Sequence, residues 1–139
     1  MEAVFGDSAH EILPGLWVGD AESAPMAIAR DFAVLNVLET GAIPGESHIP
    51  ILVPLGYRWP ADGVLAYQVR LDHAVRWIEE NESRHKLVHC GAGIERSPLT
   101  VAWYMCRRRL VADLDQAYTW LIKRRPVVQD RRMWLESLP

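Results

Sequence analysis

The sequence has little of what builds metal-stabilised or disulfide-bonded proteins. Its 139 residues include only two cysteines, Cys90 and Cys106, which form no CxxC pair and have no cluster of histidines nearby. This pattern argues against a zinc site and against a disulfide framework. Each cysteine is therefore either a small buried apolar group or a thiol whose reactivity is used.

Long hydrophobic runs are also missing. No stretch approaches the roughly 18 apolar residues of a membrane-spanning helix, and the first ten residues lack the basic and apolar regions of a secretory signal. We therefore expect a cytoplasmic protein without a membrane partner. Half of the residues are apolar and 24% are charged, which is an ordinary globular composition. This length and composition predict a single domain over residues 1–139.

The chain has no excess of positive charge. Its net charge is -3, and because nucleic-acid-binding domains usually have a pI above about 9, strong nucleic-acid binding is not expected. The charge is nevertheless uneven, at -7 over residues 1–89 and +4 over residues 90–139. This distribution has two interpretations, namely solvated helix faces or a basic rim around an anion site.

Hydrophobic period and turn residues predict the order of elements. Short strands are expected at 11–13, 16–19, 33–38, 51–53 and 86–89, with a loop at 41–50. Helices are expected at 25–30, 64–83, 98–109, 113–124 and 130–138. This alternation predicts an α/β fold, a central mostly parallel sheet of four to five strands flanked by helices. Ligands of such sheets bind at the carboxyl ends of strands, and Cys90 follows one such end.

The segment 89–98 joins a strand to a helix through a glycine-containing loop. Its successive backbone N–H groups can surround an oxyanion, and the start of the following helix adds partial positive charge. Gly91 and Gly93 tolerate the backbone angles of a tight cradle. Arg96 supplies a planar guanidinium that matches two phosphate oxygens. Because the same donors stabilise a thiolate, Cys90 is predicted to be a nucleophile beside a phosphate site.

This segment resembles the signature of the protein tyrosine phosphatase superfamily, H-C-x-x-G-x-x-R-[S/T]. The signature is matched by His89, Cys90, Gly93, Arg96 and Ser97. Segments 11–19, 34–37 and 125–128 resemble the "eIlpgLylG", "VlNv" and "RPxi" segments of the dual-specificity phosphatase branch. The resemblance covers most of the chain and implies a dual-specificity phosphatase-like fold.

Two residues depart from the pattern of that branch. Glu95 places a carboxylate in the loop where many members have a small or neutral residue. Arg131 stands where the late segment usually has Asn.

The resemblance implies a role for each residue of the signature. Cys90 would attack phosphorus to form a phosphocysteine, and His89 would hold the loop and help to keep the thiol ionised. Ser97 would donate its hydroxyl to the thiolate as phosphate departs, and it could also cap the helix that follows. The phosphate would be bound by Arg96 and by the backbone of Gly91, Ala92, Gly93, Ile94 and Glu95. The reaction would need no metal or other cofactor.

A phosphatase also needs an acid that protonates the leaving oxygen. Trp59-Pro60-Ala61-Asp62 resembles the W-P-D loop of the superfamily with one residue inserted, which makes Asp62 the expected general acid. The alternative for Asp62 is a surface turn cap. Asp72 is a rival acid, but it falls in the middle of the expected helix 64–83, where a mobile acid is hard to arrange.

The sequence therefore indicates a cysteine-dependent phosphatase that acts on phosphomonoesters. Its expected partner is a phosphorylated protein, with phosphotyrosine and/or phosphoserine/phosphothreonine, or a small phosphomonoester. Glu95 and the lack of lysine in the loop disfavour polyphosphorylated inositides. Two other classes remain open. One is a rhodanese-like or arsenate-handling enzyme, which needs no equivalent of Asp62, and the other is a catalytically dead phosphate-binding adaptor.

Overall fold

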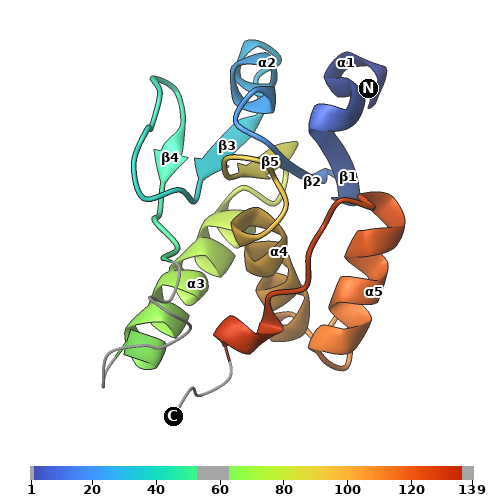
Figure 1. The fold of residues 1–139 in the computed structure, drawn as a ribbon. Helices are drawn as coiled ribbons and strands as arrows, with labels where there is room; N and C mark the ends of the chain where they lie inside the picture. Colours follow the sequence, from blue (N-terminus) through green and yellow to red (C-terminus); the bar gives the residue numbers. More distant parts are fainter. Residues whose placement is uncertain (1, 53–62, 136–139) are drawn as a thin grey trace.

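A five-stranded sheet forms the centre of the computed structural model, which describes residues 2–52 and 63–135 (Figure 1). The strands lie side by side in the order β1-β2-β5-β3-β4. Only β1 and β2 are antiparallel, and the other neighbours are parallel. The strands are β1 (Ala9–Leu13), β2 (Leu16–Gly19), β3 (Ala33–Asn36), β4 (Ser47–His48) and β5 (Lys86–His89). The predicted α/β fold with a mostly parallel sheet is confirmed.

Helices cover both faces of the sheet (Figure 1). The chain passes from β2 to β3 and then returns to β5, which lies between them. Because parallel crossovers are right-handed, the two opposite steps place their helices on opposite faces. Helices α1 (Glu2–Phe5) and α2 (Ser23–Ala29) lie on one face, and α3 (Gly63–Glu80), α4 (Arg96–Arg107) and α5 (Leu114–Arg124) lie on the other. Short 3-10 helices η1 (Gly6–Ser8) and η2 (Arg132–Trp134) complete the described chain.

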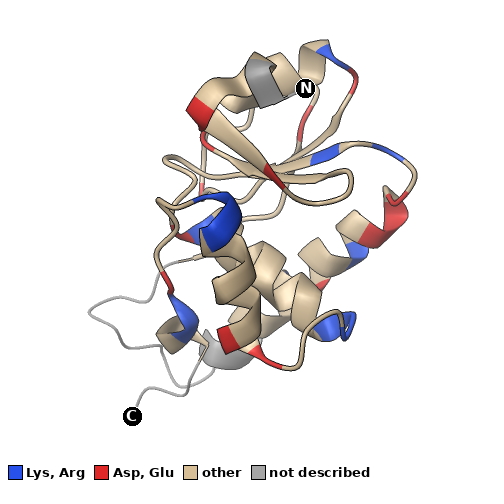
Figure 2. Cartoon of the chain, turned by 90° about the vertical axis from the view of Figure 1, so that its right-hand side faces the viewer, with Lys and Arg blue, Asp and Glu red and all other residues tan. Residues whose placement is uncertain are grey.

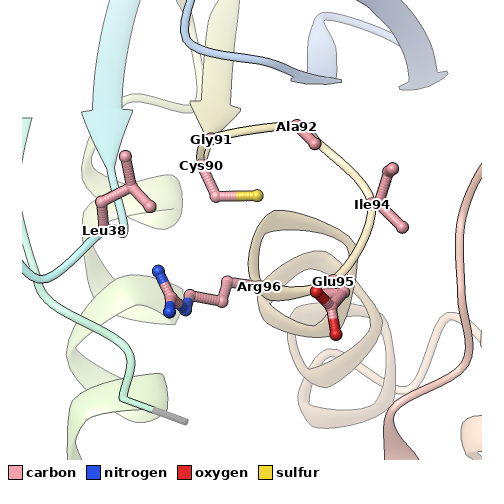
Figure 3. Close-up of a pocket in the computed structure, with 7 residues that line it drawn as sticks. All are labelled: Leu38, Cys90, Gly91, Ala92, Ile94, Glu95 and Arg96. Atoms are coloured by element: carbon pink, nitrogen blue, oxygen red, sulfur yellow. The ribbon is translucent and has the colours of Figure 1, made fainter.

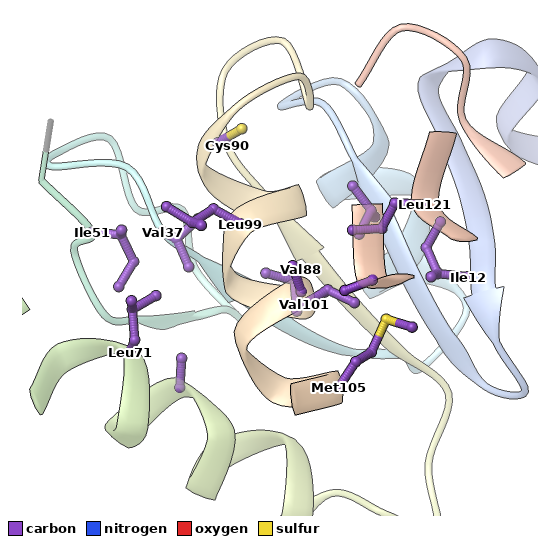
Figure 4. Close-up of a cluster of buried hydrophobic side chains, with 14 of the residues drawn as sticks. Ile12, Val37, Ile51, Leu71, Val88, Cys90, Leu99, Val101, Met105 and Leu121 are labelled. Atoms are coloured by element: carbon purple, nitrogen blue, oxygen red, sulfur yellow. The ribbon is translucent and has the colours of Figure 1, made fainter. Parts of the chain in front are cut away.

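The alternation of side chains along the inner strands divides the core in two. Trp17, Val34 and Leu87 pack with residues of α1 and α2. Val18, Leu35 and Val88 point to the other face, where they pack with α3, α4 and α5 (Figure 4). Strands buried on both faces read as continuous apolar runs, which is why the sequence predicted them well. Cys90 lies at the edge of the larger cluster.

Several predicted elements differ from the structure, most of them only by two or three residues at an end. The strand expected at 51–53 is wrong for its described residues, since the edge strand is Ser47–His48 inside the expected loop. An edge strand is covered on one side only, so its apolar pattern is weak, and both residues of β4 are exposed. Helix α4 begins at Arg96, two residues earlier than expected. Of the helix expected at 130–138, the described part is the short η2, and residues 136–139 lie outside the described residues.

The start of α5 follows the capping pattern read from the sequence. The carboxylate of Asp113 accepts from the Gln116 amide nitrogen at 3.0 Å, and the Gln116 side chain accepts from the Ala112 amide nitrogen at 2.8 Å. None of the helices in the described part of the chain is long and apolar enough to cross a membrane.

Candidate active site

The loop from Cys90 to Glu95 joins the end of β5 to the start of α4 (Figure 3). Gly93 has a φ of +69°, the left-handed region that favours glycine. A Cβ at this position would also lie 2.6 Å from the backbone carbon of Gly19. The signature glycine is therefore required both by its own backbone angle and by the close approach of β2.

Arg125 holds the outer side of this loop. Its side chain donates from Nε to the Gly93 carbonyl oxygen at 2.8 Å and from Nη2 to the Ala92 carbonyl oxygen at 3.2 Å. Nη1 donates to the Asp7 carbonyl oxygen at 2.8 Å. Arg125 is only 2% exposed, and burial lowers its pKa while nearby acidic groups oppose that effect. A buried guanidinium with these acceptors fixes the direction in which the loop carbonyls point.

The two ends of the loop are held in the same way. The Gly91 carbonyl oxygen accepts from the Ala21 amide at 3.0 Å, and the Ile94 carbonyl oxygen accepts from the Gln129 amide at 3.0 Å. In a trans peptide the C=O and the next N–H point in opposite directions, and the described chain contains no cis peptide. Four outward carbonyls therefore turn the N–H groups of residues 92–95 toward the inside of the loop.

The sulfur of Cys90 points into the space that the loop encloses (Figure 3). Ser97 Oγ lies 3.2 Å from this sulfur, and the Ser97 amide nitrogen donates to it at 3.5 Å. Ser97 is fully buried and lies inside the first turn of α4, so it is not the helix cap. A hydroxyl, an amide and the positive end of a helix thus face one thiol.

A small cavity opens over the sulfur. Its volume is about 180 Å³, and it is lined by Leu38, Cys90, Gly91, Ala92, Ile94, Glu95 and Arg96. This volume suits a phosphate group better than a drug-sized ligand. The guanidinium of Arg96 borders the cavity and has no carboxylate partner among the described residues.

The two residues that depart from the family pattern contact each other. Arg131 Nε donates to Glu95 Oε2 at 2.7 Å, with the two side chains 28% and 42% exposed. Glu95 does line the cavity, but its charge is balanced by Arg131. The repulsion of anionic substrates expected from Glu95 alone is therefore smaller than the sequence suggested.

His89, the residue before Cys90, is held by a carboxylate that the sequence pattern did not reveal. Its Nε2 lies 2.7 Å from Oε1 of Glu46, in the segment between β3 and β4. Both side chains are almost fully buried. The sequence does not reveal this role of Glu46, because Glu46 falls in the expected loop 41–50, where no local pattern marks a buried carboxylate.

The two candidate acids have different outcomes. Asp62 lies outside the described residues, so its role stays a prediction. Asp72 lies on α3 and is not among the residues that line the cavity. Its carboxylate instead accepts hydrogen bonds from Trp103 at 2.7 Å and from Arg107 at 2.8 and 3.0 Å. These bonds outweigh burial and lower the pKa of Asp72. A carboxylate held in this way is a poor proton donor.

The basic half of the sequence does not form a continuous rim around the cavity. Basic and acidic segments lie near one another in several places (Figure 2). Four arginines of residues 90–139 pair with carboxylates, in the pairs Arg107–Asp72, Arg108–Glu79, Arg131–Glu95 and Arg132–Asp115. The interpretation as solvated, paired helix faces is favoured. In the described part of the chain, no group of three or more His, Cys, Asp or Glu side chains could hold a metal ion.

Solved structures share this fold. By sequence, no protein-family model and no curated protein matches the chain. Human DUSP28 superposes with a TM-score of 0.69 at 22% identity, covering 91% of this chain and 87% of that one. DUSP15 gives 0.71 at 17% identity, with 94% and 86% covered. Human tyrosine phosphatase-like serine/threonine/tyrosine-interacting protein gives 0.68 at 18% identity, with 91% and 90% covered. The chain therefore has the fold of the dual-specificity and protein tyrosine phosphatases.

Proposed function

We propose that the chain is a cysteine-dependent phosphatase that hydrolyses phosphomonoesters, with phosphotyrosine and/or phosphoserine/phosphothreonine in proteins as its substrates. The observation that carries this proposal is the loop around Cys90. Its amides at 92–95 face inward, its thiol is contacted by Ser97, and Arg96 borders the same small cavity. Such an arrangement binds a tetrahedral oxyanion beside a nucleophile.

In the proposed reaction the Cys90 thiolate attacks phosphorus in line with the leaving oxygen. The S–P bond forms as the P–O bond breaks, and Asp62 gives its proton to the leaving oxygen. Water then attacks the phosphocysteine while Asp62 accepts a proton from it. The S–P bond breaks, inorganic phosphate leaves, and Ser97 donates to the returning thiolate. Arg96 and the inward amides hold the phosphoryl oxygens throughout.

A phosphate-binding adaptor is the second candidate. One protein with this fold is named as an interacting protein, so the fold alone does not separate binding from turnover. The buried contact between Ser97 and the Cys90 sulfur favours the enzyme, because a binding module has no use for a stabilised thiolate. A rhodanese-like enzyme is distinguished by Asp62→Asn, which would leave its activity unchanged.

The test compares the two cysteines of the chain. Cys90→Ser should abolish hydrolysis of an aryl phosphate and of phosphopeptides, while orthovanadate still binds to it. In a second experiment, rapid acid quench of the unmodified protein with ³²P-labelled substrate should trap a phosphocysteine. Cys106→Ser is the control and should keep full activity, because Cys106 lies on α4, half-buried and away from the cavity. All assays contain a chelator. Full activity of Cys90→Ser would contradict the covalent mechanism. If the unmodified protein binds vanadate but hydrolyses none of the substrates, the adaptor is favoured.

A further inference from the structure

The segment between β3 and β4 carries a carboxylate that reaches the residue before the nucleophile. Glu46 Oε1 and His89 Nε2 are 2.7 Å apart, and their side chains are 1% and 4% exposed. A carboxylate only accepts, so Nε2 of His89 carries the hydrogen and donates it. The other ring nitrogen, Nδ1, lies 3.4 Å from the carbonyl oxygen of Cys90.

Glu46 is itself held firmly. Its second oxygen accepts from Nδ2 of Asn36 at 2.9 Å and from the Ile43 amide at 2.8 Å. Burial raises the pKa of Glu46, but the hydrogen bonds from His89, Asn36 and Ile43 outweigh burial and the pKa falls below its ordinary value. The group at this position is therefore a buried, ionised carboxylate whose geometry is fixed before any substrate arrives.

The fixed carboxylate holds the imidazole in one orientation, with Nδ1 facing the Cys90 carbonyl oxygen. The ring belongs to the last residue of β5, and the next residue is Cys90. The held ring in turn holds the peptide group from which the Cys90 side chain extends. Glu46 can therefore act on the nucleophile through His89 without touching the cavity.

We propose that Glu46 is a positioning residue for the nucleophile, which orients the His89 ring through Nε2 and so favours the Cys90 thiolate. This inference rests on the proposed function, because it assigns Glu46 to the machinery of that same site.

Several other charged or titratable groups surround His89 and Cys90. Glu95 and Arg96 line the cavity with Cys90, and Arg125 interacts electrostatically with Cys90, Asp20 and Asp7. One step further out, Arg125 contacts His10 of β1, Tyr67 of α3 interacts with Arg96, and His48 of β4 contacts the Leu38 carbonyl oxygen. Of the described carboxylates, Glu46 is the one within hydrogen-bond distance of His89. A change at Glu46 is therefore a direct probe of the ring.

The experiment measures the thiolate without requiring turnover. In Glu46→Gln, the rate of Cys90 alkylation by iodoacetate should reach half of its plateau about one pH unit higher than in the unmodified protein. The acidic limb of kcat/KM for an aryl phosphate should move in the same direction, which lowers kcat/KM about tenfold on that limb. Glu46→Asp keeps the charge and should recover part of both shifts.

The control is Asp72→Asn, which removes another paired carboxylate, on α3 and away from the cavity. It should lower the melting temperature and leave the alkylation profile in place. If Glu46→Gln and Asp72→Asn lower the melting temperature alike and neither moves the profile, Glu46 has only a structural role and the inference fails. If the profile moves while the unmodified protein hydrolyses no phosphomonoester, the proposed function fails and the effect of Glu46 on the thiol stands. Should Glu46→Gln not fold, an unshifted profile in Glu46→Asp and in His89→Asn would overturn the inference.

Discussion

Gly93 is the residue at which the loop leaves no room for a side chain. Its φ is positive, and the atoms closest to a Cβ built there belong to the Gly19 backbone and to the Arg125 guanidinium, at 2.6 and 2.7 Å. Backbone atoms of a central strand cannot move away cheaply. The loop is thus shaped by contacts on its outer side as much as by its own glycines.

We expect Gly93→Ala to destabilise the protein by about 1–3 kcal/mol, since a non-glycine residue in a strained backbone conformation costs this much. The same substitution should weaken orthovanadate inhibition at least tenfold. The matched control is Gly91→Ala, whose Cβ would meet only the Leu38 side chain at an ordinary 3.9 Å. Thermal melts and vanadate inhibition constants of the two variants provide the measurement. Equal melting temperatures and equal vanadate inhibition constants for Gly93→Ala and Gly91→Ala would contradict this account of the loop.

The Glu95–Arg131 pair sets the charge at the mouth of the cavity. Arg131→Asn leaves Glu95 without its partner, so KM for an aryl phosphate should rise, by no more than about fivefold because partly exposed pairs contribute about 1 kcal/mol or less. Glu95→Gln should instead lower KM, more for a doubly phosphorylated peptide than for the aryl phosphate. The double variant should return close to the unmodified KM.

Steady-state kinetics at two ionic strengths would check this coupling, because salt should shrink both single effects. If the effects of the two substitutions simply add, the pair does not act as a unit. Identical effects of Glu95→Gln on both substrates would mean that Glu95 does not face the bound substrate.

At the scale of elements, Asp72 joins α3 to α4. It accepts from Trp103 Nε1 and from two nitrogens of Arg107, all on α4. Burial raises the pKa of Asp72, but these donors outweigh burial and lower it. Because the pKa is lower in the folded than in the unfolded state, the stabilisation is present above the unfolded pKa near 3.9 and is lost as the pH falls through the folded pKa.

Asp72→Asn should therefore lower the unfolding free energy by about 1 kcal/mol at pH 7, a modest value because both side chains are more than a third exposed and are screened by solvent. The difference should shrink as the pH falls through the lowered folded pKa, where the native carboxylate becomes protonated as well. Urea denaturation at pH 7 and at a series of acidic pH values measures this. Since Asp72 does not line the cavity, kcat should be unchanged for good and poor leaving groups alike, and a leaving-group-dependent loss would restore Asp72 as a candidate acid.

At the scale of the whole molecule, the two halves of the sequence compensate each other's charge. Arg107 and Arg108 at the end of α4 pair with Asp72 and Glu79 of α3, so positive charge of the second half meets negative charge of the first. The segregation of charge along the sequence is therefore a property of chain order. In space the pairs bridge neighbouring helices.

The sequence alone predicted the sheet and most helices because their signals are local. Strands 16–19 and 33–36 are buried on both faces and fall in apolar runs, and α5 begins at a recognisable cap. The edge strand β4 was missed because its two residues are exposed and carry no apolar pattern. Helix α4 begins at Arg96, ahead of the expected start at 98, because proline is favoured throughout the first turn of a helix and does not mark its first residue.

The composition of the candidate site was likewise determined by sequence, because Cys90, Gly93, Arg96 and Ser97 lie within one strand-loop-helix unit whose chemistry is local. The orientation of that unit was decided only by tertiary structure. The groups that turn the loop amides inward are Ala21, Arg125 and Gln129, and the carboxylate on His89 is Glu46, all at least 30 residues from the atoms they hold. Such contacts depend on which strands become neighbours, and the order β2-β5-β3 brings these distant segments to the end of β5.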